Sequence, residues 1–317
     1  MRGLDPSLRQ ADGTRLAPHV AAKLPADTVG AGGVAAGVHL AMVGDASSLI
    51  LGMRAVGKTT TPAPTVADMF TVWCGDRVVA HAPVVDQVVI ELPRRAADDV
   101  IAVYLPEATS TLVTWVQAGG GELRPAPSGP RWVAYGDSIT QGWSVSDAGR
   151  AWPSVVAREL GLDLVNLGFA GSARGELPAA IQVSESGADL VTLSWGTNCW
   201  SSIPTDVNQI AETMRLFLTV VRQGLPEVPV VVLSPIVRPG AETEPNRFGS
   251  TLEHLRDALE ATVAAMALTD DHLFLVPGRE LVQQQDLVDG VHPGDTGQLA
   301  LAAALTPVIR NALRPTL

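Results

Sequence analysis

Three short polar segments of this 317-residue chain contain the side chains needed for acyl transfer. The first contains Ser138, the second contains Asn198, and the third places Asp289 three residues before His292. A serine hydroxyl attacks a carbonyl carbon when a nearby base, most often an imidazole, accepts its proton. A carboxylate can orient that imidazole, and a side-chain amide can stabilise the oxyanion that forms. The residue types therefore predict a serine-dependent site, provided that the fold brings the segments together.

The first two segments each follow an apolar run that predicts a buried strand. Residues 132–135 precede the Gly-Asp-Ser of 136–138, and residues 189–193 precede the Gly-Thr-Asn of 196–198. The Asp and His of 289–292 lie just before the start of a predicted helix. Ligands of open parallel sheets bind beyond the carboxyl ends of the strands, so we expect the three segments to meet there.

These segments carry a resemblance to a known family. Gly-Asp-Ser at 136–138, a following Gly-rich turn, Gly-Thr-Asn at 196–198 and Asp-x-x-His at 289–292 are similar to the four sequence blocks of the SGNH hydrolases, or GDSL-type esterases. The resemblance covers roughly residues 129–317. The third block is usually Gly-x-Asn-Asp, and Cys199 stands where the second acid often lies. The family resemblance implies a parallel sheet of strand order 2-1-3-4-5.

The resemblance also implies a role for each residue. Ser138 would attack the ester, His292 would act as the general base, and Asp289 would hold the imidazole in the required tautomer. The oxyanion would accept hydrogen bonds from the backbone N–H groups of Ser138 and Gly171 and from the side-chain amide of Asn198. Gly171 is preferred to Gly168 because the matching glycine follows the strand. This mechanism requires neither a cofactor nor a metal.

Each of these residues has a common structural interpretation as well. Ser138 could belong to a helix N-cap, Asp289 could be a turn residue, and the two glycines could only shape a turn. The combination favours catalysis, because a purely structural protein does not need the whole set. The order Ser, Asp, His also occurs in α/β-hydrolases. However, Ser138 lacks a G-x-S-x-G elbow, and the acid and base are too close in sequence.

Aromatic and thiol side chains lie next to the polar segments. Trp143 and Trp200 are candidates for substrate binding, because an aromatic face can hold a sugar ring or an acyl chain; burial in the core is the alternative. Cys199 is expected to be a small buried residue, since no paired base follows it at a recognisable spacing. The loop 286–292 lacks the further ligands that a metal site would need.

Composition indicates a well-packed acidic protein. Apolar residues make up 46% of the chain, charged residues make up 17%, and the net charge is −11. The acidity argues against nucleic acid and anionic membranes as partners, because both require clustered Lys and Arg. Cys74 and Cys199 are far apart and do not form a disulfide framework. The first residues lack the apolar core of a signal peptide and no stretch could span a membrane, so a cytoplasmic location is expected.

The two halves of the chain differ in the spacing of their apolar runs. From about residue 35 to 123 the runs are short and separated by Gly, Asp and Pro, which predicts an antiparallel β-sandwich. Residues 70–73 and 78–81 flank a Cys-Gly-Asp-Arg turn and predict a hairpin. After the Pro-rich linker 124–130, strand–helix alternation predicts a three-layer α/β/α domain with a five-stranded parallel sheet. We place the sandwich domain at 1–125 and the catalytic domain at 126–317.

The predicted function is hydrolysis of a short-chain acyl ester, such as an acetyl group on a sugar or small polyol, through an acyl-enzyme. The substrate would then be a small-molecule or carbohydrate ester. A thioesterase or a biosynthetic acyltransferase would use the same residues, and the sandwich also permits a carbohydrate-binding or scaffolding protein without catalysis. The sequence leaves open the acyl group, the alcohol and the oligomeric state.

Overall fold

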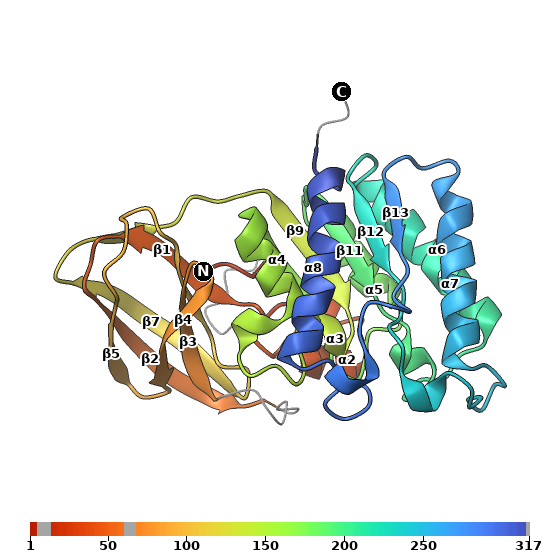
Figure 1. The fold of residues 1–317 in the computed structure, drawn as a ribbon, viewed down its shortest axis with the longest axis horizontal. Helices are drawn as coiled ribbons and strands as arrows, with labels where there is room; N and C mark the ends of the chain where they lie inside the picture. The colour runs from red at the N-terminus through yellow and green to blue at the C-terminus, as the bar shows by residue number, and fades with distance from the viewer. Residues whose placement is uncertain (5–13, 60–67, 315–317) are drawn as a thin grey trace.

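One parallel and two antiparallel β-sheets form the strand framework in the computed structural model, which describes residues 1–4, 14–59 and 68–314 (Figure 1). The parallel sheet has the order β10-β9-β11-β12-β13, which confirms the predicted order 2-1-3-4-5. Its strands are β9 (Arg131–Gly136), β10 (Asp163–Gly168), β11 (Leu190–Ser194), β12 (Val230–Leu233) and β13 (Leu273–Val276). Because all neighbouring pairs are parallel, the carboxyl ends lie at one edge of the sheet.

Helices cover both faces of the parallel sheet. They are α4 (Trp152–Leu160), α5 (Leu177–Ser184), α6 (Val207–Gly224), α7 (Leu252–Ala267) and α8 (Asp295–Ala312). Successive side chains of a strand point to opposite faces. On β9, Trp132 and Ala134 therefore pack in one cluster with α4 and α8. Val133 and Tyr135 pack in another cluster with α5, α6 and α7. This confirms the three-layer α/β/α arrangement.

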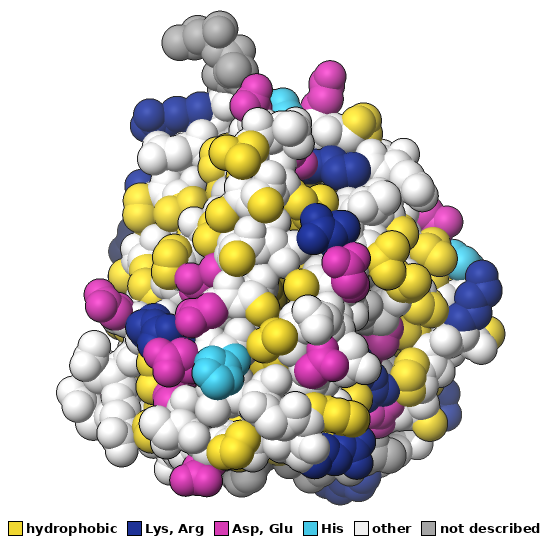
Figure 2. Space-filling view, turned by 90° about the vertical axis from the view of Figure 1, so that its right-hand side faces the viewer, with side chains coloured by type: hydrophobic (Ala, Val, Ile, Leu, Met, Phe, Trp, Pro, Cys, Tyr) yellow, Lys and Arg dark blue, Asp and Glu magenta, His cyan; other side chains and the backbone are white. Residues whose placement is uncertain are grey.

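Helix α6 shows how the apolar pattern sets these layers. It begins after Asp206, whose side chain forms a capping box with Gln209. Its buried positions recur at helical spacing and are Ile210, Met214, Phe217, Leu218 and Val221. On the opposite face, where α6 and α7 meet solvent, acidic and basic side chains alternate with scattered hydrophobic ones (Figure 2). Within the described ranges, no helix is long and apolar enough to cross a bilayer.

The antiparallel sheets pack face to face and confirm the predicted sandwich. One has the order β4-β3-β6-β1-β8 and the other β5-β2-β7. Their strands are β1 (His39–Gly44), β2 (Ser48–Lys58), β3 (Met69–Cys74), β4 (Arg77–Pro83), β5 (Gln87–Glu91), β6 (Ile101–Tyr104), β7 (Thr109–Gly119) and β8 (Leu123–Pro125). A shared apolar core includes Leu49, Phe70 and Val103. The predicted hairpin is present, with Cys74 paired to Arg77 across a two-residue turn.

The segment before the sandwich packs on the parallel-sheet side of the molecule. It contains the short helices α1 (Pro18–Ala21) and α2 (Ala26–Gly32), which the sequence patterns did not predict. Leu16 and Ala31 belong to the same buried cluster as Tyr135 of β9. The domain boundary that we place at residue 125 stays a prediction. Helices α1 and α2 pack against the α/β part and not within the sandwich core.

A polar and aromatic contact joins the sandwich to the α/β part. The Trp73 indole of β3 donates a hydrogen bond to Asp147 at 3.0 Å. The Arg158 guanidinium of α4 lies 3.9 Å from the centre of the Trp73 ring and donates to the Tyr104 hydroxyl at 2.9 Å. Since Trp73 and Tyr104 are almost fully buried, this contact fixes the sandwich against the layer that contains α4.

Candidate active site

Ser138 is the first residue of the short helix α3 (Ser138–Gln141), which follows the end of β9. The Asp137 side chain caps this helix by accepting a hydrogen bond from the Ile139 N–H at 2.9 Å. As the first helical residue, Ser138 has a backbone N–H without a partner inside the helix. Gly136 permits the close approach of β9 to β11, because a Cβ there would lie 2.4 Å from the Ser194 carbonyl oxygen.

The structure brings Ser138, His292 and Asp289 into one hydrogen-bonded chain. The Ser138 Oγ is 2.9 Å from the His292 Nε2. The His292 Nδ1 is 2.7 Å from an Asp289 oxygen. The other Asp289 oxygen accepts the backbone N–H groups of Val291 at 3.0 Å and His292 at 2.8 Å. The carboxylate is thus held in the loop that carries the imidazole, and the imidazole faces the serine.

The environment of Asp289 favours its ionised form. Partial burial alone would raise the pKa of Asp289, but hydrogen bonds from the His292 ring and backbone lower this pKa below its ordinary value. An ionised carboxylate on Nδ1 can stabilise the imidazolium that forms when Nε2 accepts a proton.

Gly171 and Asn198 lie on two segments that are tied to each other. Asn198 follows β11 in a short 3-10 turn and donates its side-chain amide to the Ser172 carbonyl. The side-chain oxygen of Gln141, from α3, accepts the Ala170 N–H at 3.0 Å. Gly171 therefore sits between two anchored residues, with a left-handed φ of +72°, and a Cβ there would meet no described atom within 4 Å. Gly168, the last residue of β10, is instead packed against α3.

Sequence comparison assigns this chain to a family. The chain matches the GDSL-like Lipase/Acylhydrolase family over residues 130–310, which is more than half of its length. The chain belongs to this family. It is an enzyme that hydrolyses ester bonds, and the resemblance to SGNH hydrolases is confirmed. No match was found among curated proteins.

The similarity of this acylhydrolase to solved structures covers both the sandwich and the α/β part. A salicylyl-acyltransferase from a tetracycline biosynthetic pathway has 22% identity and a TM-score of 0.78, covering 94% of this chain and 89% of its own. A GDSL-like lipase, so described, from Bacteroides ovatus has 18% identity and a TM-score of 0.76, covering 95% and 92%. A family two carbohydrate esterase from Clostridium thermocellum, in complex with cellohexaose, has 15% identity and a TM-score of 0.64, covering 87% and 91%. These likenesses establish the shared fold.

Arg15 supports the acylhydrolase site from outside the family match, and sequence reasoning missed it. Its side chain is fully buried and donates to the carbonyl oxygens of Asn166 at 2.7 Å and Gly168 at 2.8 Å. It also donates to the carbonyls of Ala31 at 2.6 Å and Val34 at 2.5 Å. Burial lowers the pKa of Arg15 to about 10, which leaves it charged. Arg15 therefore ties the N-terminal segment to the start of the loop that contains Gly171.

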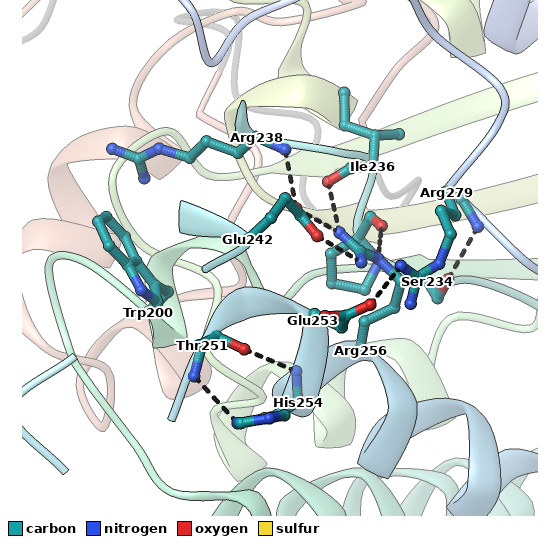
Figure 3. Close-up of polar contacts among 12 residues, drawn as sticks. Trp200, Ser234, Ile236, Arg238, Glu242, Thr251, Glu253, His254, Arg256 and Arg279 are labelled. Carbon is teal, nitrogen blue, oxygen red and sulfur yellow. Dashed lines mark hydrogen bonds and ion pairs between the residues drawn. The ribbon is translucent and has the colours of Figure 1, made fainter. Parts of the chain in front are cut away.

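The two candidate tryptophans lie in different surroundings. The Trp143 ring is 6.0 Å from the His292 ring, between centroids, and is half-buried. The Trp200 indole donates to the Glu244 carbonyl at 2.8 Å, and the Arg238 guanidinium lies over its ring (Figure 3). Trp143 is thus placed beside His292, and Trp200 beside the connection between β12 and α7.

Cys199 is buried, as sequence reasoning expected. Its exposed fraction is 1%, and burial raises the pKa of its thiol to about 12. The thiolate is the nucleophilic form of cysteine, so the thiol next to Asn198 is unreactive near neutral pH.

Glu107 is a buried acid near the Gln141 side chain of α3. It lies between β6 and β7, and its exposed fraction is 2%. Neither of its carboxylate oxygens makes a hydrogen bond of normal geometry within the described residues. Burial raises the pKa of Glu107 to about 7, against the opposing effects of the Arg15 charge and the nearby Gln141 side chain. The folded protein therefore keeps this proton at pH values where the unfolded chain has lost it.

We expect the free energy of unfolding to fall less between pH 5 and pH 8 in Glu107→Gln than in the wild type. Because the folded-state pKa is raised, the unfolded state ionises first, and wild-type stability falls as pH rises through this window. The glutamine amide cannot ionise, so the variant should gain roughly 1–3 kcal/mol over wild type at pH 8 and little at pH 5. Denaturant unfolding at the two pH values measures this. Glu122→Gln, at an exposed position, is the control, and parallel pH profiles for E107Q and wild type would contradict the expectation.

Proposed function

We propose that this acylhydrolase uses Ser138, His292 and Asp289 to hydrolyse a short-chain acyl ester through an acyl-enzyme. The observation that carries the proposal is the continuous chain from the Ser138 Oγ to the His292 Nε2 at 2.9 Å and from the His292 Nδ1 to Asp289 at 2.7 Å. Such a chain lets the imidazole accept the serine proton while the carboxylate stabilises the resulting charge.

In the first step, the Ser138 Oγ bonds to the ester carbonyl carbon while its proton passes to the His292 Nε2. The negative charge moves to the carbonyl oxygen, where the N–H groups of Ser138 and Gly171 and the side-chain amide of Asn198 would donate to it. The intermediate then collapses, the bond to the leaving oxygen breaks, and His292 returns its proton to the alcohol.

In the second step, water loses a proton to His292 and its oxygen attacks the acyl-enzyme. The new tetrahedral intermediate uses the same oxyanion donors. Its collapse releases the carboxylic acid, and the proton returns from His292 to the Ser138 oxygen. Asn198 has one N–H on the Ser172 carbonyl, which leaves its second amide hydrogen for the substrate.

The substrate that we favour is an acetyl or similarly short acyl group on a sugar or small polyol. The Trp143 ring beside His292 offers an apolar face next to the reacting serine. The fold is also shared with a carbohydrate esterase that was solved with cellohexaose. A biosynthetic acyltransferase is the second candidate, supported by the shared fold with a salicylyl-acyltransferase over 94% of this chain.

A series of 4-nitrophenyl esters tests the acyl preference. We expect the highest kcat/KM between acetyl and butyryl, followed by a steep decline, because the Trp143 ring, 6.0 Å from the His292 ring between centroids, occupies space that a long acyl chain beside His292 would need. A maximum at octanoyl or longer would contradict the short-acyl assignment. Matched ester and thioester donors, each with and without an added polyol acceptor, separate hydrolysis from acyl transfer.

A further inference from the structure

Arg238 places a positive charge near the candidate triad. It lies on the connection between β12 and α7, and its guanidinium is 4.8 Å from the centre of the Trp200 ring (Figure 3). Trp200 follows Asn198 by two residues in the sequence. The opposite charge of Asp289 also acts on this guanidinium. The cation therefore lies beside the segment that carries Asn198, and its charge interacts with that of Asp289 on the neighbouring loop.

The guanidinium of Arg238 has no hydrogen bond or ion pair with any residue that the structure describes. Arg238 is half-buried, and every other buried or half-buried arginine among those residues donates a side-chain hydrogen bond. These are Arg2, Arg15, Arg95, Arg131, Arg150, Arg158, Arg174, Arg222 and Arg256. A partly desolvated charge without a partner is costly, so Arg238 differs from the arginines that stabilise the fold.

The neighbouring carboxylates are already engaged. Glu242 accepts the backbone N–H of Arg238 at 3.1 Å, while its two oxygens bind the Arg256 guanidinium at 2.8 and 2.9 Å (Figure 3). Asp289 is bound to His292. The side chain of Arg238 instead extends away from Glu242, on the side of Trp200 (Figure 3). Trp200 is itself fixed by its hydrogen bond to Glu244 of the same connection.

This arrangement presents free donors on a fixed platform. Partial burial lowers the pKa of Arg238, against the effect of Asp289, but an arginine remains charged in proteins. A guanidinium that lies over an indole keeps its N–H groups available at its own edge. These groups can donate two parallel hydrogen bonds to a carboxylate or a phosphate. In a chain of net charge −11, an anionic ligand needs such a local cation.

We propose that Arg238, stacked on Trp200, binds an anionic group on the substrate of this acylhydrolase. The group is a carboxylate or a phosphate that lies on the leaving alcohol or its attached moiety. The assignment builds on the proposed ester hydrolysis at Ser138 and narrows its substrate class to esters that carry such a charge. Arg238 acts in this proposal on substrate binding and makes no contribution to bond breaking.

Matched acetyl esters test the proposal directly. The carboxylate arm compares 4-acetoxybenzoate with its neutral amide, 4-acetoxybenzamide, and the phosphate arm uses 4-acetoxyphenyl phosphate. We expect the wild type to hydrolyse one of the two anionic esters with a higher kcat/KM than 4-acetoxybenzamide, mainly because its KM is lower. In Arg238→Gln the ratio of kcat/KM between that anionic ester and the neutral amide should fall roughly 10- to 100-fold, as expected for loss of a charge-assisted hydrogen bond. The arm that responds identifies the anion.

The control is Arg247→Gln. Arg247 lies on the same connection and stacks on Phe248, with its guanidinium 5.2 Å from that ring, but it is exposed. This variant should keep the wild-type ratio. An unchanged ratio in R238Q would overturn the proposal. An equal loss of kcat on charged and neutral esters would also overturn it, because Arg238 would then act through Asp289 or through the loop structure.

A binding measurement separates this inference from the proposed hydrolysis. Calorimetry with 4-hydroxybenzoate, 4-hydroxybenzamide and 4-hydroxyphenyl phosphate reports anion recognition without turnover. The wild type should bind one of the anionic phenols more tightly than the neutral amide. If R247Q keeps this preference and R238Q loses it, the anion site is supported even when the esters are not hydrolysed. Hydrolysis of the neutral ester without any preference for an anion in rate or binding would leave the function intact and refute the role of Arg238.

Discussion

Replacing Ser138 with alanine is expected to reduce ester hydrolysis by roughly 10⁴- to 10⁶-fold, because in the proposed mechanism the Ser138 oxygen forms the acyl-enzyme and the variant lacks it. The residual rate would come from the oxyanion donors, which the substitution leaves in place. The fold should be kept, since the change removes one buried oxygen and the cap of α3 is supplied by Asp137. Initial rates with 4-nitrophenyl acetate and a thermal unfolding curve measure the two effects.

Ser154→Ala is the matched control for this variant. Ser154 is as buried as Ser138, but it lies on α4 and its hydroxyl has no hydrogen-bond partner among the described residues. S154A should retain wild-type activity and react with a serine-directed phosphonate, whereas S138A should do neither. Hydrolysis by S138A at close to the wild-type rate would refute the proposed mechanism.

Asn198→Ala is expected to lower kcat by roughly 100- to 1000-fold with a much smaller change in KM, the usual result of removing one oxyanion donor. The donor is needed most when charge develops on the carbonyl oxygen, so its loss affects the transition state more than the bound substrate. Steady-state kinetics on a short-chain ester give both parameters.

The control for Asn198→Ala is Asn208→Ala, at an exposed position in the first turn of α6. Because Asn198 also donates to the Ser172 carbonyl, thermal unfolding must accompany the kinetics. An effect limited to KM would show that Asn198 contributes only to ground-state binding.

The sequence predicted those parts of the molecule whose signals are local. The strands of the parallel sheet are buried on both faces, so each is a continuous apolar run that stands out from its neighbours. Asp289 and His292 are three residues apart on one loop, and their contact needs no knowledge of the rest of the fold. Cys74 and Arg77 likewise close a hairpin through a short turn.

The unpredicted parts depend on partners that leave no mark in the sequence. The four carbonyl oxygens around Arg15 belong to the backbone, which every residue has, so an isolated arginine near the N-terminus gave no sign of burial. Trp200 was singled out as an aromatic near Asn198, but its stacking on Arg238 joins positions that are far apart in the chain. Only the folded connection between β12 and α7 brings them together.

The buried Arg15 has a consequence for the order of events during protein synthesis. Its contacts with the carbonyls of Asn166 and Gly168 span 151 and 153 residues. Contacts across such separations form late, since a long loop must close first. The guanidinium therefore stays in contact with water until the strands that carry these two carbonyls have been synthesised and have left the ribosome. Before β10 is synthesised, the guanidinium has only the carbonyls of Ala31 and Val34 as acceptors, and the two acceptors that complete its set do not yet exist.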